Sequence, residues 1–373
     1  MNANQRFDTI LQQRLNERKA NGLLRTLVCP ESKIDFSSND YLGFSRLPQL
    51  KNIEAASIPS GSTGSRLVTG NSQLAEETEK IIATFHKAES ALIFNSGYMA
   101  NCGLFSCISS KQDTFIADEY IHASIIDGMR LSHATRHKFK HNDINDLEKK
   151  LNQSTGNKFI VIESIYSMDG DEAPLKEIVT LAKKYDALVI VDEAHANGVF
   201  GDTGEGLVVK YNLQNEVYAC IYTFGKGLGL HGAVVTGSNT LRSFLINYAR
   251  SFIYTTALPP HTYLQIQEAY KLLPTANRNK LFELINYFRA SIQQLKNISF
   301  IESRSPIQAI IMADNFKAKA LATHLNEKGF FIKGILSPTV PAGTERLRIC
   351  IHAFNTTEQI DLLINEINSF QLK

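Results

Sequence analysis

The chain lacks the cysteine pattern of a disulfide-stabilised or zinc-binding protein. Its five cysteines in 373 residues are an odd number, and no two of them form a C-x-x-C pair. Most have apolar neighbours, as Cys220 has between Ala219 and Ile221. Buried free thiols in a reducing compartment fit this pattern better than disulfide bonds or a zinc site.

The chain also lacks an excess of charge of either sign. It has 39 basic and 37 acidic residues, so its formal net charge is +2, which argues against binding nucleic acid or a membrane surface through bulk charge. No apolar run approaches the length of a membrane span, and the polar start Met-Asn-Ala-Asn-Gln-Arg is unlike the core of a signal peptide. We therefore expect a cytoplasmic protein with neither nucleic-acid nor membrane partners.

Short apolar runs alternate with helical patterns between about residues 74 and 270. With 43% hydrophobic residues the chain can build a full core. The runs lie at residues 91–94, 114–117, 159–163, 187–191, 219–223 and 233–236. Continuous apolar strands separated by helices are typical of an α/β fold with a mostly parallel sheet covered on both faces. Ligands of such sheets bind at the carboxyl ends of the strands.

The regions before and after this one predict a further division of the chain. A helix is expected from about Phe7 to Leu24, and the following residues are extended and rich in turns. After Pro259-Pro260, helices alternate with strand-like runs at 309–312, 330–332 and 347–351. We expect an N-terminal segment at 1–45, a large domain at 46–258 and a small C-terminal α/β domain at 259–373.

Two ionisable residues follow predicted strands. Asp192 comes directly after the run 187–191, and Lys226 lies between two glycines shortly after the run 219–223. Pyridoxal phosphate needs a lysine for a Schiff base and a carboxylate that keeps its ring nitrogen protonated. Taken singly, Lys226 matches a solvated loop residue and Asp192 a helix cap. Together they predict a pyridoxal-phosphate site.

Further polar residues follow the same strands. Backbone N–H groups of residues 95–101, helped by the Ser96 hydroxyl, suit a phosphate, although an ordinary helix cap has the same pattern. His122 can stack on a planar ring and move a proton, or cap the next helix. Ser167 and His195 can hydrogen-bond ring substituents, and Thr223 can donate to the phosphate.

Three other motifs predict no additional site. Residues 227–232 match G-x-G-x-x-G, but no Asp or Glu lies between Glu216 and Glu268 to bind a ribose. Residues 61–65 lack the G-K-[ST] ending of a nucleotide-triphosphate loop. His133, His137 and His141 recur every fourth residue, yet their segment alternates like a strand and no carboxylate or cysteine completes a metal set. We interpret them as surface histidines and predict no metal site.

Seven stretches together resemble the α-oxoamine synthases, which are pyridoxal-phosphate enzymes of fold type I. They are residues 36–43, 61–70, 95–101, 164–171, 191–195, 223–229 and 252–260. The resemblance covers nearly the whole chain and implies an aminotransferase-like fold with a large and a small domain. One departure is Ala75, where the family usually has a histidine.

The resemblance implies a role for each matching residue. Lys226 would form the Schiff base and act as general base and acid. Asp192 would pair with the ring nitrogen and His195 with the phenolic oxygen, while His122 would stack on the ring. The phosphate would be held by Ser96, Gly97, Tyr98 and Thr223.

The resemblance also implies a partner and a substrate site. Thr255 and Thr256 would reach the phosphate of a neighbouring subunit, so we expect a homodimer with shared active sites. Arg348 would bind the carboxylate of an amino-acid substrate. The rest of the substrate pocket would be lined by Arg25, Asn39 and Glu163.

The forms at 64–70 and 223–227 most resemble the branch that condenses L-alanine with a pimeloyl thioester in biotin biosynthesis, with loss of CO2. The acyl donor can be a thioester of coenzyme A or of an acyl carrier protein. A sister enzyme that uses glycine and a short acyl-CoA is the alternative. A catalytically silent subunit of the same fold is a further one, against which the presence of Lys226 argues. A fused DNA-binding regulator is not expected, because no N-terminal extension could hold a helix-turn-helix domain.

Overall fold

The computed structural model describes residues 1–30, 32–51, 53, 58–295 and 298–370. They form two compact units. The large unit contains residues 39–282 and 352–354, and the small unit contains 1–38, 283–351 and 355–373. The first 38 residues therefore belong to the same unit as most of the C-terminal part of the chain. The sequence patterns place these two parts in separate segments.

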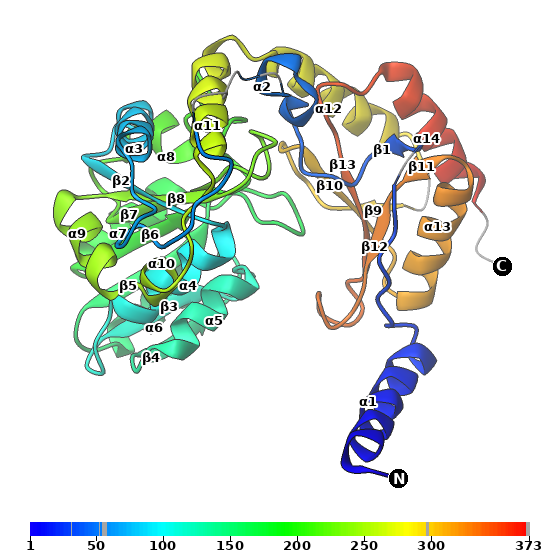
Figure 1. The fold of residues 1–373 in the computed structure, drawn as a ribbon. Helices are drawn as coiled ribbons and strands as arrows, with labels where there is room; N and C mark the ends of the chain where they lie inside the picture. The colour runs from blue at the N-terminus through cyan, green and yellow to red at the C-terminus, as the bar shows by residue number, and fades with distance from the viewer. Residues whose placement is uncertain (31, 52, 54–57, 296–297, 371–373) are drawn as a thin grey trace. The chain divides into compact units, whose positions relative to one another are not determined.

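The large unit is built on a seven-stranded sheet with the order β2-β8-β7-β6-β5-β3-β4 (Figure 1). All neighbours from β7 to β4 pair in parallel, whereas β8 runs antiparallel to both β2 and β7. The strands are β2 (Ser90–Phe94), β3 (Thr114–Asp118), β4 (Thr135–Phe139), β5 (Lys158–Glu163), β6 (Ala187–Asp192), β7 (Ala219–Thr223) and β8 (Ala233–Gly237). The predicted mostly parallel sheet is confirmed, and the predicted apolar runs agree with these strands within about a residue at each end.

Helices alternate with these strands along the chain. They are η1 (Phe44–Arg46), α2 (Pro48–Lys51), α3 (Gln73–Phe85), α4 (Gly97–Cys107), α5 (Ala123–Leu131), α6 (Ile144–Gln153), α7 (Leu175–Lys184), α8 (Leu207–Lys210), α9 (Asn239–Tyr248), α10 (Arg250–Ile253), α11 (Pro260–Leu272) and η2 (Leu273–Thr275). Short polar side chains set several helix starts, as Ser72 does for α3 and Asp143 for α6.

Both faces of the sheet are buried. Phe159 and Val161 of β5 belong to a core cluster that also contains Leu104 and Phe105 of α4. The side chain of Ile160 points to the opposite face by strand alternation and is fully buried as well. Strands covered on both sides need continuous apolar residues, which explains why they were visible in the sequence.

The small unit has two short sheets. One is antiparallel with the order β12-β13-β10-β9, and the other is the parallel pair β1-β11. Its elements are α1 (Ala3–Ala20), β1 (Ile34–Asp35), β9 (Ser299–Phe300), β10 (Ile307–Ile311), α13 (Asn315–Glu327), β11 (Phe330–Phe331), β12 (Lys333–Ile335), β13 (Arg346–Cys350) and α14 (Thr357–Ser369). Helix α12 (Arg278–Ile292) begins in the large unit and ends in the small one.

The structure contains no candidate for a membrane span. Across the residues that it describes, no helix combines the length and the apolar character that crossing a membrane requires.

Candidate active site

A cavity of about 280 Å³ lies at the carboxyl ends of the parallel strands of the large unit. Residues that end or follow β2, β3, β5, β6 and β7 line it, because parallel strands present these ends at one edge of the sheet. The lining consists of Asn39, Ser96, Gly97, Tyr98, Asn101, His122, Ser124, Glu163, Asp192, Ala194, Thr223, Gly225, Lys226, His231 and Gly232. Nine of the residues predicted from the sequence are therefore brought together.

The amine of Lys226 contacts a histidine that is itself held by a tyrosine. Lys226 Nζ lies 2.9 Å from His195 Nε2, and His195 Nδ1 lies 2.7 Å from the hydroxyl of Tyr41. That hydroxyl donates to Asn39 Oδ1 at 3.1 Å, so His195 Nδ1 carries the proton and donates to Tyr41. His195 Nε2 is then an acceptor for the Lys226 ammonium group.

The carboxylate of Asp192 is buried and oriented by two hydrogen bonds. Its Oδ1 accepts from the backbone N–H of Ala194 and its Oδ2 from Asn101 Nδ2, both at 2.9 Å. No α-helix begins directly after Asp192, since the chain continues in turns to α8. The helix-cap alternative for Asp192 is therefore wrong.

His122 caps α5 and also lines the cavity. The backbone N–H of Ser124 donates to His122 Nδ1 at 3.2 Å, so the cap alternative is confirmed for this residue. Burial lowers the pKa of His122, although the charge of Asp192 opposes this effect. A neutral ring with its proton on Nε2 follows, because Nδ1 accepts a hydrogen bond.

The start of α4 offers backbone donors to the cavity. The Ser96 side chain caps the helix by accepting from the Met99 N–H at 3.2 Å, which leaves the first N–H groups without a partner inside the helix. Glycine at position 97 allows this close approach, since an added Cβ would lie 2.6 Å from Thr223 Cγ2 and would force Thr223 to shift. The result is a small concave surface of N–H groups and hydroxyls that suits an anion.

Glu163 stands opposite Asp192 on neighbouring parallel strands. Burial raises its pKa well above the usual range, and the charge of Asp192 raises it further, while Lys226 acts in the other direction. The two carboxyl groups thus differ: Asp192 is held by N–H donors, whereas Glu163 favours its protonated form, which can donate a hydrogen bond.

Comparison with known proteins places this geometry in a family. Residues 31–367 match the family model of aminotransferase class I and II. The chain belongs to this family. A relative from Emericella nidulans, 8-amino-7-oxononanoate synthase, is 42% identical over 96% of this chain and 94% of its own length.

Two solved structures extend the comparison of this aminotransferase-class chain. The 8-amino-7-oxononanoate synthase of Francisella tularensis is 31% identical, covers 91% of this chain and 97% of its own, and gives a TM-score of 0.80. A serine palmitoyltransferase variant from S. paucimobilis, with a bound aldimine of PLP and myriocin, is 28% identical with a TM-score of 0.87, over 99% and 98% of the two chains.

The cavity of this family member fits pyridoxal phosphate. Lys226 offers a primary amine for the aldehyde, Asp192 a buried carboxylate for the ring nitrogen, and the start of α4 donors for the phosphate. Two buried side-chain oxygens in the lining, Asn101 Oδ1 and Glu163 Oε1, have no hydrogen-bond partner among the described residues. Such atoms are expected where a polar ligand binds. No group of His, Cys, Asp and Glu in the described part of the chain could hold a metal ion.

The other predicted residues lie outside the cavity lining. Thr255 and Thr256 follow α10, where Asn95 Nδ2 donates to Thr256 O at 2.7 Å. Ser167 is buried in the turn after β5. Arg25 is exposed after α1 of the small unit, and Arg348 lies in β13, where its Nη1 is 3.1 Å from Cys350 Sγ.

The sequence patterns missed three residues that hold the predicted ones. Tyr41 contacts His195, Asn101 contacts Asp192, and Ser124 Oγ lies 2.7 Å from His122 Nδ1. Tyr41 and Asn101 stand within stretches that resemble the α-oxoamine synthases, and Ser124 is two residues beyond His122.

One interpretation from the sequence is wrong. His141 is not a surface histidine, because it lies between two carboxylates, with Nδ1 3.0 Å from Asp118 and Nε2 2.7 Å from Asp171. Strand periodicity was read correctly there, since β4 covers most of the segment. The partners were not visible, because Asp118 ends β3 and Asp171 lies in the turn after β5, both distant from His141 in the sequence.

Proposed function

We propose that the chain is a pyridoxal-phosphate-dependent acyltransferase that condenses L-alanine with a pimeloyl thioester. The products are 8-amino-7-oxononanoate, CO2 and the free thiol. The observation that carries the proposal is the lining of one cavity by Lys226 and Asp192, with His195 2.9 Å from the lysine amine. The name of the relative that is 42% identical over 96% of the chain supports this branch of the family.

The residues around the amine would move one proton. When bound, pyridoxal phosphate supplies an electron sink for negative charge on the Cα atom of the amino acid. With the cofactor bound, Lys226 would hold its aldehyde carbon until the amine of alanine takes that place, and the freed lysine amine would then accept the Cα proton. His195 keeps the lysine amine in place through its Nε2 atom, and Tyr41 fixes the tautomer that makes Nε2 an acceptor. Asp192 would keep the ring nitrogen of the bound cofactor protonated through its negative charge.

The anion-binding surface at α4 would hold the cofactor phosphate through Ser96, Gly97, Tyr98 and Thr223. His122, neutral because of its burial, would cover one face of the ring, and Ser167 would bind a ring substituent. Thr255 and Thr256 do not line the cavity of their own subunit, which supports their contribution to a second copy of the chain in a homodimer. Light scattering of the purified protein measures its oligomeric state. A monomer would remove both threonines from the site.

The substrates would be bound by the remaining predicted residues. Arg348 would pair with the carboxylate of alanine, because a guanidinium group forms two parallel hydrogen bonds to a carboxylate. Protonated Glu163 and the Asn39 amide would donate to the acyl group or to the carboxylate, and Arg25 would complete the pocket. The acyl group would arrive on coenzyme A or on an acyl carrier protein.

Replacement of Lys226 by alanine tests the proposal. The wild-type protein should be yellow, and borohydride should trap its cofactor on Lys226, which peptide mass spectrometry locates. Lys226→Ala should keep the fold yet form no 8-amino-7-oxononanoate. Turnover by this variant near the wild-type rate would contradict the assignment, and absence of turnover in the wild type would favour a silent subunit.

A substrate panel separates this reaction from its sister reactions. Alanine, glycine and serine are each offered with pimeloyl, acetyl and palmitoyl thioesters, and the product masses are recorded. Alanine with the pimeloyl thioester should react fastest. A preference for glycine with acetyl-CoA would replace the substrates but leave the roles of Lys226 and Asp192 in place.

A further inference from the structure

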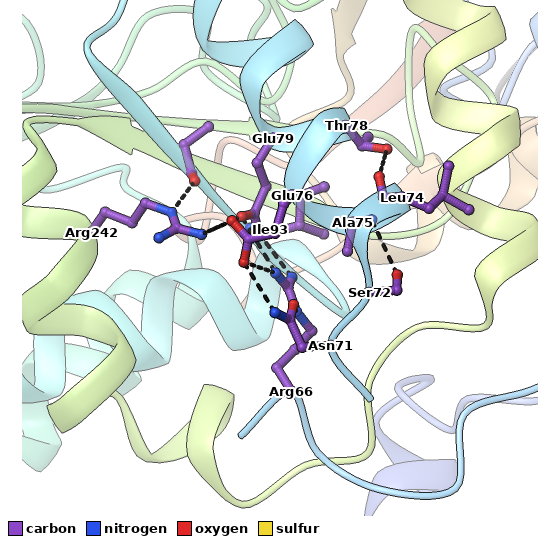
Figure 2. Close-up of polar contacts among 11 residues, drawn as sticks. Arg66, Asn71, Ser72, Leu74, Ala75, Glu76, Thr78, Glu79, Ile93 and Arg242 are labelled. Carbon is purple, nitrogen blue, oxygen red and sulfur yellow. Dashed lines mark hydrogen bonds and ion pairs between the residues drawn. The ribbon is translucent and has the colours of Figure 1, made fainter. Parts of the chain in front are cut away.

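A buried carboxylate joins four elements of the large unit. Glu79 of α3 is 3% exposed, and its Oε1 accepts from Arg66 Nη1 and from the backbone N–H of Ile93, both at 2.9 Å. Its Oε2 accepts from Arg242 Nη2 at 2.7 Å. Figure 2 shows Arg66 and Arg242 converging on this carboxylate from two sides.

Both arginines are held at a second point. Arg66 Nε donates to Asn71 Oδ1 at 2.7 Å, and Arg242 Nε donates to the carbonyl of Ala91 in β2 at 3.0 Å. The side chain of Arg66 is only 7% exposed. Loop 61–70, α3, β2 and α9 are therefore joined through one carboxylate, and β2 leads directly into the start of α4.

Loop 61–70 in turn holds the segment that carries Thr255 and Thr256. The N–H of Ala257 donates to Gly64 O at 3.0 Å, and Ser62 Oγ donates to Leu258 O at 2.7 Å. Gly70 packs so closely that an added Cβ would lie 2.6 Å from Ala257 Cβ. The backbone directly after the two threonines is thus fixed by this loop.

We propose that Arg66 and Glu79 are positioning residues for the cofactor phosphate. Their ion pair fixes loop 61–70, and the loop fixes segment 255–258 so that Thr255 and Thr256 are presented to the phosphate of a second copy. The inference rests on the proposed function, because the cofactor phosphate and the second copy of the chain are both parts of that proposal. It also explains a buried charge cluster that no catalytic step uses.

The geometry of Arg66 makes its replacement by lysine informative. The guanidinium group donates to Asn71 through Nε and to Glu79 through Nη1, so it fixes a direction as well as a charge. A lysine keeps the charge beside buried Glu79 but reaches only one partner. Arg66→Lys should therefore fold, whereas Glu79→Gln leaves two arginines without their buried partner and tests the same link more severely.

The experiment compares two aldehydes on the cofactor-free full-length protein. Pyridoxal phosphate and pyridoxal both bond to Lys226, but only the first has a phosphate, so the ratio of their dissociation constants isolates the phosphate contacts. Absorbance titration gives both constants. Arg66→Lys should weaken the binding of pyridoxal phosphate about tenfold, which corresponds to the loss of one charge-assisted hydrogen bond. The binding of pyridoxal should be unchanged.

Two further variants sharpen the comparison. Thr255→Ala combined with Thr256→Ala should raise the ratio of the pyridoxal phosphate constant to the pyridoxal constant, and adding Arg66→Lys to this pair should raise it little more. Glu76→Gln is the matched control, because Glu76 contacts both arginines from the preceding turn of α3 but has a side chain that is 39% exposed. It should leave the ratio near the wild-type value.

Three results would overturn the inference. Equal weakening of both aldehydes by Arg66→Lys would show a general structural role, and an unchanged ratio would show no role at the phosphate. Full additivity with the threonine variants would show that Arg66 acts by another route. A wild-type protein that binds pyridoxal as tightly as pyridoxal phosphate would instead contradict the phosphate site of the proposed function itself.

Discussion

Asp192 combines a fixed orientation with a charge, and the two can be separated. Asp192→Asn keeps an oxygen for the N–H of Ala194 but removes the negative charge that would keep the ring nitrogen protonated. Cofactor should still bond to Lys226, while exchange of the alanine Cα proton with solvent should slow on the order of 100-fold, as expected for the loss of one preorganised electrostatic contact. Proton NMR in deuterated buffer measures the exchange. An unchanged rate would leave Asp192 only a structural role in its turn.

His141 connects two elements that carry predicted site residues. Asp118 ends β3, four residues before His122, and Asp171 closes the turn that contains Ser167. Burial alone lowers the pKa of His141, but its hydrogen bonds to Asp118 and Asp171 outweigh burial and raise the pKa from its ordinary value of 6.5 to about 9. The charged ring therefore stabilises the end of β3 and the turn after β5 at neutral pH.

This ion pair predicts a pH-dependent stability. A pKa that is raised on folding contributes stability that is fully present below about pH 6.5 and is lost as the pH rises through about 9. The unfolding free energy of His141→Gln should be lower than that of wild type by roughly 2–3 kcal/mol near pH 6, and by much less near pH 10. Urea unfolding at the two pH values gives the difference.

The matched control is His133→Gln, because His133 is exposed just before β4. It should leave the unfolding free energy near wild type at both pH values. A loss for His141→Gln that is the same near pH 6 and near pH 10 would mean that the packing of the ring, and not its charge, stabilises this region.

The difference between His141 and Asp192 shows what can be predicted from the sequence of this chain. Strands such as β5 and β6 were found because burial on both faces makes them continuously apolar, and Asp192 was found because it ends such a strand. The partners of a side chain depend on which strands become neighbours. Tyr41 and His195, which are 154 residues apart, meet only because of the tertiary fold, as do His141 and Asp171. No local pattern encodes these pairs.

Arg348 tests whether the small unit takes part in substrate binding. It lies in β13 of this unit, where its backbone pairs with Ala309 and Lys333. If Arg348 binds the alanine carboxylate, Arg348→Lys should weaken alanine binding by roughly 1.5–3 kcal/mol, the range for a hydrogen bond to a charged group. Cofactor absorbance and melting temperature should stay nearly unchanged.

The control for Arg348 is the same substitution at Arg289 of α12, which forms an ion pair with Glu302. Surface ion pairs contribute about 0–1 kcal/mol, and Arg289→Lys should not change alanine binding. Titration with alanine, followed through the cofactor absorbance, compares the two variants. An alanine affinity of Arg348→Lys that equals wild type would restrict Arg348 to a role within β13.

The antiparallel strand β8 sets the order in which the large unit can be assembled. Among the described strands of the sheet, β2 lies at the edge and pairs only with β8, so that Ser90 is opposite Gly237. This pairing closes the chain between Ser90 and Gly237 into one long loop, and closing a long loop is slow and entropically costly. On the ribosome, the strand that leads into Ser96 and Gly97 therefore has to wait for residues that are synthesised much later. Formation of the anion-binding surface is thus a late folding event, and a nascent chain that stops before β8 should contain those residues without being able to hold a phosphate.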